Sequence, residues 1–332
     1  MPLAVLNPGG SDPEQRFPDL AGAPDGGVHA PVNYHAYAAC TGGGFFRKAS
    51  SIPAEWSHVL LLLRYDLQPS LHALRELKAA GKTVAVSVKE SGLHQVAQLL
   101  GEAGNIAHLR ELCAEADGAL ASTPEVVELY RAAGARHAAF IPTPYPVDDP
   151  RWDFSVPIAE RRGVLIGTRE WEVPTRNHAQ ALLLAATLGE PITVSNMDGR
   201  AGRKRLAALG LGDRLQVLEG SRSYPEYLRE LARHRLVFQL DASAVPGQVA
   251  GDALLCRVPC VGGNGATDRV AFPHAIGAER ALVVARELLA DPASYRAAVE
   301  SAQARALDDL SFKNVAVQIE EFFGSIPASA AG

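Results

Sequence analysis

Short apolar runs alternate along the chain with stretches in which apolar residues recur every three to four positions. The run Val59–Leu63 is typical of a buried strand, whereas the spacing of Leu71, Leu74 and Leu77 is typical of an amphipathic helix. Strands that alternate with such helices predict parallel sheets covered on both faces. Ser122-Thr123-Pro124-Glu125 has the form of a capping box. The predicted strands are residues 4–6, 45–46, 59–63, 83–88, 118–121 and 138–141, then 163–167, 192–194, 215–218, 236–240 and 259–261.

A cluster of prolines interrupts this alternation near the middle of the chain. Proline is excluded from helix interiors and central strands, and it stiffens linkers, so the cluster predicts a domain boundary. The prolines are Pro142, Pro144, Pro146, Pro150 and Pro157. The predicted parts are an N-terminal Rossmann-like domain over 1–145, a linker over 146–162, a second such domain over 163–309, and a terminal helix and tail over 310–332. Ligands of doubly wound domains bind beyond the carboxyl ends of the strands, here in an expected cleft between the halves.

Composition narrows the class of protein further. The chain has 332 residues, of which 47% are hydrophobic and 21% charged, close to the average of globular proteins. It has no apolar run long enough to span a bilayer and no basic segment before its first apolar run, so a cytoplasmic protein is expected. A net charge of −5 argues against nucleic acid as a partner. The absence of H-E-x-x-H, G-x-S-x-G and zinc-type spacings disfavours hydrolases and metalloenzymes.

An ordered set of short segments in the second half resembles a known family. The segments are Gly167-Thr168-Arg169 with Arg176, Leu218-Glu219-Gly220 with residues 227–231, Gly247 with residues 252–261, residues 287–292, and Leu310-Ser311-Phe312. Together they resemble the donor-binding domain of GT-B-fold glycosyltransferases, especially the retaining family 4 type. In the first half, Asp25-Gly26-Gly27-Val28-His29, Ser122–Glu125 and Ile141-Pro142 add to the resemblance. It covers most of residues 115–323.

This resemblance implies both a fold and an activity. The fold would be two Rossmann-like domains facing across a cleft, with the C-terminal helix crossing back to the N-terminal domain. The activity would be metal-independent, retaining transfer of a sugar from a nucleotide-diphosphate donor, of UDP or GDP type, to an unidentified glycan, lipid or small molecule. No other cofactor is implied, and a homodimer is possible. The family usually carries two acidic residues separated by seven; here the second is Asp252, but the first falls on Ala244, which cannot ionise.

The candidate donor-site residues lie where predicted strands end and helices begin. The charge of the departing diphosphate has to be stabilised, and arginine suits phosphate because its planar fork bonds bidentately. Arg169 and Arg176 are therefore expected to be catalytic, Asp252 to hold the ribose, and Gly247 to let a phosphate approach the backbone. The remaining donor-side candidates are Gly167, Ser221, Ser223 and Tyr224, the last three near the base, and Asn264, near the sugar.

Two catalytic candidates come from the first half. Glu90 follows the strand that ends at Val88, so it is expected to orient an acceptor hydroxyl or contact the sugar. His35 could act as the base of an inverting enzyme, because histidine titrates near neutral pH. The acceptor-side loop is expected to contain Gly26, Gly27 and His29.

Other functions fit the same architecture. A catalytically lapsed glycosyltransferase-like binding protein or partner subunit is the main alternative, and Ala244 is its best support. An epimerase would need no acceptor. A cofactor-dependent phosphorylase would need a Schiff-base lysine, and Lys204 and Lys313 have no convincing setting for one. An exported solute-binding protein would need an export signal.

Overall fold

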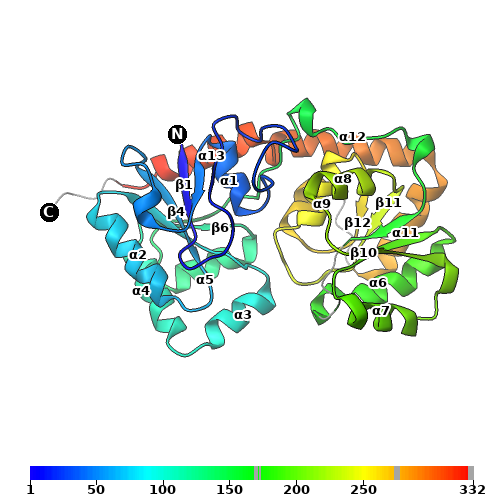
Figure 1. Ribbon diagram of the computed structural model, residues 1–332, viewed down its shortest axis with the longest axis horizontal. Helices are drawn as coiled ribbons and strands as arrows, with labels where there is room; N and C mark the ends of the chain where they lie inside the picture. Colours follow the sequence, from blue (N-terminus) through cyan, green and yellow to red (C-terminus); the bar gives the residue numbers. More distant parts are fainter. Residues whose placement is uncertain (168–170, 172, 273–276, 328–332) are drawn as a thin grey trace. The chain divides into compact units, whose positions relative to one another are not determined.

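The computed structural model describes residues 1–167, 171, 173–272 and 277–327, and the chain divides into two compact units (Figure 1). Unit 1 comprises Met1–Asp148 and Asp309–Gly332, and unit 2 comprises Asp149–Asp308. The segment that follows Asp148 packs on unit 2: Trp152 is buried, and the Phe154 N–H donates to the Leu255 carbonyl over 2.9 Å. In the described part of the chain, every helix is too short or too polar to cross a membrane.

Unit 1 is built on a seven-stranded sheet with the order β2-β3-β1-β4-β5-β6-β7. All neighbouring strands are parallel except β2, which runs antiparallel to β3. The strands are β1 (Leu3–Leu6), β2 (Gln15–Arg16), β3 (Gly44–Phe46), β4 (His58–Leu63), β5 (Thr83–Val88), β6 (Gly118–Ala121) and β7 (Ala138–Phe140). The helices are α1 (Tyr34–Cys40), α2 (Gln68–Ala79), α3 (Leu93–Gly101), α4 (Asn105–Glu115), α5 (Val127–Ala132) and α13 (Phe312–Gly324).

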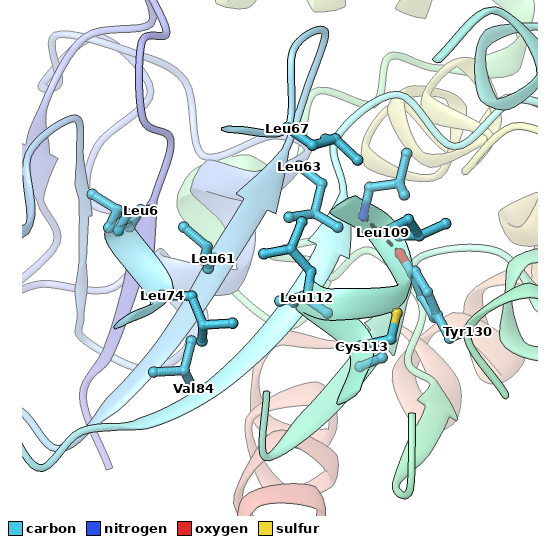
Figure 2. Close-up of a cluster of buried hydrophobic side chains, with 14 of the residues drawn as sticks. Leu6, Leu61, Leu63, Leu67, Leu74, Val84, Leu109, Leu112, Cys113 and Tyr130 are labelled. Carbon is cyan, nitrogen blue, oxygen red and sulfur yellow. Dashed lines mark hydrogen bonds between the residues drawn. The ribbon is translucent and has the colours of Figure 1, made fainter. Parts of the chain in front are cut away.

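Alternate residues of the unit 1 strands form one side of its core. Side chains such as Leu61 and Leu63 of β4 meet Leu74 of α2 and Leu112 of α4 (Figure 2). The Tyr130 hydroxyl of α5 accepts a hydrogen bond from the Val88 N–H over 2.6 Å, so a buried polar group is satisfied at the end of β5. These apolar contacts exclude water and hold the carboxyl ends of the strands in fixed register.

The terminal helix α13 belongs to unit 1. Phe322 lies against β6 so closely that a Cβ on Gly118 would come within 2.9 Å of its ring. The Phe322 ring also lies 4.7 Å from that of His137, and the Phe323 ring lies 5.1 Å from that of His58. The end of the chain therefore covers strands formed by its beginning.

Unit 2 is built on a five-stranded sheet with the order β10-β9-β8-β11-β12, and its strand pairs are parallel. The strands are β8 (Val164–Ile166), β9 (Ile192–Asn196), β10 (Leu215–Glu219), β11 (Leu236–Phe238) and β12 (Cys260–Val261). The helices are α6 (His178–Ala185), α7 (Gly199–Ala208), α8 (Tyr224–Ala232), α9 (Gln248–Leu255), α10 (Ala266–Ala271), α11 (Ala278–Ala290) and α12 (Pro292–Asp309). The predicted α/β class with doubly wound parallel sheets is confirmed.

The local prediction of a capping box at Ser122 is wrong. The helical turn there begins after Thr123, which makes no side-chain cap bond. The Ser122 hydroxyl instead lies 2.9 Å from the Ser91 hydroxyl and accepts from Tyr34 over 3.4 Å. The Ser122 hydroxyl is therefore part of a buried hydrogen-bond network with Tyr34 of α1 and Ser91, and it does not cap the helix as the local pattern predicted.

The side of unit 2 where β8 begins is fastened by one buried cation. The Arg161 guanidinium donates to the Val156 carbonyl over 2.9 Å and 3.1 Å, and to the Arg257 carbonyl over 2.5 Å. It also donates to the Cys256 carbonyl at the end of α9 and to the Tyr295 hydroxyl of α12. A cation at a helix C-terminus is favoured by the helix dipole, so this side chain ties α9 and α12 to the start of the sheet.

Replacing Arg161 with methionine should destabilise the protein strongly. The substitution keeps much of the apolar volume but leaves several buried carbonyls without a donor, which should cost about 3 kcal/mol or more of unfolding free energy. Urea unfolding followed by circular dichroism measures this. The matched control is Arg162→Met, since Arg162 is exposed and donates only to nearby carbonyls. Equal midpoints for the two variants would contradict this role.

Candidate functional site

The strand order of unit 2 reverses between β8 and β11. In open parallel sheets, ligands bind beyond the carboxyl ends of the strands at such a switch point. Three segments meet at this edge: Gly167 after β8, residues 239–247 after β11, and residues 262–265 after β12. We therefore take this edge of unit 2 as the candidate site.

Glycines allow these segments to pack tightly. A Cβ on Gly167 would lie 2.5 Å from Val249 of α9, and one on Gly265 would lie 2.7 Å from the Gly247 Cα. Gly262 has a φ of 90°, and a Cβ there would overlap the Gln239 carbonyl. Gly247, with a φ of 89°, occupies the N-cap of α9. The predicted glycines Gly167 and Gly247 are thus both at the candidate site, and they keep the backbone open at the helix N-terminus.

A buried ion pair joins the residues before α6 to the segment after β11. The Arg176 guanidinium contacts the Asp241 carboxylate, and the two side chains are 14% and 4% exposed. Asp241 also accepts from the Ser243 N–H over 2.8 Å and from the Ser243 hydroxyl. The Asn177 amide donates to the Leu240 carbonyl over 2.9 Å. Arg176 therefore lies at the predicted edge, just before α6. Its guanidinium pairs with Asp241, a residue that was not among the predicted site residues.

Asp252 lies inside α9 and is 1% exposed. Its Oδ1 accepts from the Tyr224 hydroxyl over 2.5 Å. Burial raises the pKa of Asp252 to about 7, although the hydroxyls of Tyr224 and Tyr227 favour the ionised form. A ribose hydroxyl that reached this carboxylate would compete with the hydroxyls of Tyr224 and Tyr227. The contact between Asp252 and a ribose thus remains a prediction. In this structure the Tyr224 hydroxyl occupies the place that a ribose hydroxyl would need.

The loop that carries Ala244 packs against the loop after β12. The Ala244 N–H donates to the Asn264 Oδ1 over 2.9 Å, and Ala244 is buried with a φ of 50°. Asp268 accepts from the Gly265 N–H over 2.9 Å and from the Gln239 amide over 3.2 Å. Burial, together with the neighbouring Asp241 charge, raises the pKa of Asp268 to about 7. Asn264 thus acts here as a brace between two loops of the site.

Of the predicted base-side residues, Ser221 and Ser223 lie on the loop before α8 and Tyr224 is the first residue of that helix. Ser221 and Ser223 are exposed, and Tyr224 is partly buried. The Glu226 carboxylate accepts from the Ser223 N–H over 2.9 Å and from its hydroxyl over 2.8 Å, so Ser223 fixes the start of α8. Arg169, the other predicted phosphate contact, lies outside the described residues.

At the carboxyl end of the unit 1 sheet, Glu90 is partly exposed. Its Oε1 lies 4.0 Å from the Lys89 ammonium, and its Oε2 accepts from Gln95 over 3.4 Å. Lys89 also pairs with Asp12, whose other hydrogen bond comes from the Asn7 amide over 3.0 Å. Burial disfavours the charged form of Asp12, but the Lys89 ammonium outweighs it and holds its pKa below the ordinary value.

His35 occupies a different environment from the one predicted. It is 3% exposed, and its ring is stacked between Phe45 at 3.8 Å and His29 at 4.0 Å. Burial and the nearby His29 lower the pKa of His35 to about 4, so it is neutral at pH 7 and its Nε2 donates to the Pro13 carbonyl. This geometry does not favour a catalytic base, because the Nε2 proton is held by Pro13 and the ring is buried, and a catalytic role for His35 stays a prediction.

The glycines of the predicted acceptor-side loop are exposed. Gly26 ends a turn in which its N–H donates to the Ala23 carbonyl over 2.9 Å. Gly27 lies beside Gln15, whose Oε1 accepts from the His29 N–H over 2.8 Å. The loop is thus tied to β2 through Gln15, and its His29 ring is committed to the stack on His35.

Sequence reasoning missed Asp241, Asp12 and Lys89. Each lies at or near the carboxyl edge of a parallel sheet, and Asp241 and Lys89 come directly after segments that were predicted as strands. The position of Asp241 and Lys89 after a strand was the available signal. Their partners could not be predicted, because Arg176 lies 65 residues from Asp241 in the chain and Asp12 lies 77 residues from Lys89. Among the described residues, no group of three or more His, Cys, Asp or Glu could hold a metal ion.

Comparison with known proteins places the fold. No protein-family model and no curated protein sequence matches the chain. Many solved structures resemble it at low identity, among them the following three. Anabaena HepE in complex with UDP and glucose has a TM-score of 0.59 at 17% identity, covering 82% of this chain and 79% of that one.

The other two structures extend the likeness. An α-glucosyltransferase in complex with UDP-glucose and DNA containing an abasic site has a TM-score of 0.63 at 10% identity, covering 97% and 99% of the two chains. The UDP-forming α,α-trehalose-phosphate synthase of Burkholderia vietnamiensis has a TM-score of 0.60 at 12% identity, covering 86% and 74%. The chain therefore has the GT-B fold of these glycosyltransferases, as the resemblance predicted.

The buried Asp252 should make stability depend on pH. Its pKa of about 7 compares with 3.8 for an exposed carboxyl, so between these values the folded state holds a proton that the unfolded state has released. Stability from this group is therefore greatest at low pH and falls as pH rises to about 7, by on the order of 4 kcal/mol.

Asp252→Asn removes this titration while an amide oxygen can still accept from Tyr224. Between pH 5 and pH 8, the Tm of the wild type should fall by several degrees relative to the Tm of the variant. Thermal melts across this range measure it, with the exposed Asp213→Asn as control. A Tm difference that is constant with pH would contradict the account of a buried, protonated Asp252.

Proposed function

We propose that this chain is a glycosyltransferase that moves a sugar from a nucleoside-diphosphate donor, of the UDP type, to an acceptor hydroxyl. The observation that carries the proposal is the edge of unit 2 where β8, β11 and β12 end. Close-packed glycines, the N-terminus of α9 and the Arg176–Asp241 pair meet there at the switch point of the sheet. The resembling structures that are complexes with UDP or UDP-glucose support the choice of donor.

The chemistry requires a stabilised leaving group. The bond from the anomeric carbon to the β-phosphate oxygen breaks, its electron pair leaves with UDP, and the acceptor oxygen forms the new bond while losing its proton. A diphosphate beside Gly247 would meet the positive end of the α9 dipole. Arg176 would supply a fixed positive charge, oriented by Asp241, and Arg169 would supply a second. These groups suffice for our proposal of a metal-independent reaction.

The nucleoside would lie along the start of α8. Ser221 and Ser223 are exposed there, and Tyr224 hydrogen-bonds to Asp252. We propose that the Tyr224 hydroxyl marks the position of a ribose hydroxyl, which would take over its hydrogen bond to Asp252. The exchange replaces one hydroxyl donor with another, so the buried carboxylate stays satisfied throughout.

On the acceptor side, Glu90 remains the proposed group that orients or deprotonates the acceptor hydroxyl. It is partly exposed at the end of β5, and its Oε1 lies 4.0 Å from the Lys89 ammonium. His35 has no part in this scheme. Retention of configuration stays a proposal that rests on the family resemblance.

A catalytically lapsed relative is the second candidate, and Ala244 favours it. This residue holds the position of the usual first acidic group and is buried. Asp241, three residues earlier, cannot replace that acid because it is committed to Arg176. A lapsed protein would bind UDP-sugars without releasing UDP, whereas the enzyme would release UDP, even if slowly to water. A coupled assay for UDP distinguishes the two.

The donor site predicts selective binding of uridine nucleotides. In a thermal-shift panel of UDP, GDP, ADP, CMP and dTDP, UDP should raise the Tm most, since a ligand at 100 times its Kd adds about 2.7 kcal/mol. Arg176→Met should weaken UDP binding about tenfold or more, the cost of a lost charge-assisted contact.

Arg286→Met is the matched control, because Arg286 is an exposed arginine of α11 that contacts Thr187. It should bind UDP as the wild type does. A flat panel at millimolar nucleotide, or equal UDP affinity in both variants, would count against the donor site.

A further inference from the structure

Unit 1 has a switch point of its own, between β1 and β4. In its parallel strands the chain moves from β1 to β3 on one side, then crosses to β4, β5, β6 and β7 on the other. The residues that follow β1, β4 and β5 are Asn7, Arg64 and Lys89, so their chemistry gathers where such sheets bind ligands. The Lys89 N–H donates to the Leu63 carbonyl over 2.9 Å, which sets the ends of β4 and β5 side by side.

Tyr65 stands out at this edge. It is 68% exposed and has a φ of 51°, a conformation that a bulky residue adopts at a cost. The loop is nevertheless fixed, because the buried Asn105 donates to the Tyr65 carbonyl over 2.5 Å and accepts from the Leu67 N–H over 3.2 Å. Strain that the surrounding structure maintains at an exposed aromatic residue points to a use for that ring.

One face of the Tyr65 ring is already covered. The Arg64 guanidinium lies 4.3 Å from the ring centroid and donates to the Tyr65 hydroxyl over 2.6 Å. The solvent-exposed surface of Tyr65 is therefore mainly the opposite face of its ring. A rigid, one-sided aromatic platform is suited to a flat apolar surface, which it can stack against at little cost in side-chain entropy.

Hydrogen-bonding groups follow the two strands on either side of β4, the strand that leads to Tyr65. Asn7 and Asp12 lie after β1, and Lys89 and Glu90 lie after β5. The Asn7 Oδ1 and the Arg64 Nε are buried and have no hydrogen-bonding partner among the described residues. Buried polar atoms are usually satisfied, so this edge holds unmet hydrogen-bonding capacity.

The balance of charge indicates the class of ligand. The positive charges of Arg64 and Lys89 are matched by the carboxylates of Asp12 and Glu90, and the Lys89 ammonium contacts both of these carboxylates. A phosphate or carboxylate would meet no surplus positive charge here. A sugar ring would meet both an aromatic face for its C–H groups and donors and acceptors for its hydroxyls.

We propose that Tyr65, with Asn7, Asp12, Lys89 and Glu90, binds a neutral sugar ring, and that the acceptor is a neutral glycan or glycoside. The identification of this sugar as the acceptor rests on the proposed glycosyltransferase function. The binding itself involves unit 1 residues alone, so it can be tested without a donor.

The test is saturation-transfer difference NMR on the full chain, with methyl α- and β-glycosides of glucose, galactose, mannose and N-acetylglucosamine as probes. At least one glycoside should show saturation, strongest at ring C–H protons on one face. Tyr65→Gly removes the ring and relieves the positive φ, so it should fold normally and bind roughly three- to tenfold more weakly. Tyr65→Phe should retain most of the binding.

Ile106→Ala is the matched control, an exposed apolar side chain of α4 outside this cluster, and it should bind as the wild type does. The proposal is overturned if no glycoside binds, if Tyr65→Gly binds unchanged, or if glucose 6-phosphate binds and neutral glycosides do not. UDP thermal shifts on the same variants separate the two claims. Sugar binding that depends on Tyr65 without UDP binding would leave this site standing and remove the donor function, and the converse would remove this site alone.

Discussion

The buried ion pair between Arg176 and Asp241 is the constraint on which the edge of unit 2 depends. Taking both charges out of water is costly, so the pair forms only where geometry and extra hydrogen bonds offset that cost. Ser243 supplies such bonds to Asp241, and Asn177 joins the same two segments. The pair therefore aligns the end of β11 with the start of α6, and the glycines beyond it can then pack around the N-terminus of α9.

Both units concentrate their chemistry at the same kind of place. In each unit, polar and charged residues follow the strands on either side of a switch point. At such a point the connections from neighbouring strands run in opposite directions, which leaves room for a ligand beyond the carboxyl ends of the strands. The opposite edge of unit 2 is different, because the Arg161 guanidinium there is saturated by carbonyls and a hydroxyl and fastens elements together. An arginine thus stabilises the fold at the amino edge of unit 2, and in our proposal another arginine, Arg176, stabilises the charge of the ligand at the carboxyl edge.

Periodicity in the sequence predicted most strands and long helices, because burial on one face or both leaves a local pattern. It missed β2, a short edge strand, and α7, whose sequence is mostly polar. It placed Arg176 and Gly247 correctly at the carboxyl edge, since that position depends on chain order alone. It could not show that Tyr224 covers Asp252 or that His35 is stacked on Phe45, because those contacts join distant segments. Such contacts decide whether a polar residue meets solvent, and no local pattern encodes them.

In our proposal, the carboxyl edge of unit 2 receives the nucleoside diphosphate. Hydrogen exchange of the full chain with and without saturating UDP-glucose tests this binding site, since it maps binding along the backbone without assuming a product. Exchange should become slower in residues 220–224, 241–248 and 262–266 and stay unchanged in the amino-edge segment around Arg161. Protection that is absent from all three segments, or confined to other parts of the chain, would show that the nucleotide binds elsewhere or does not bind.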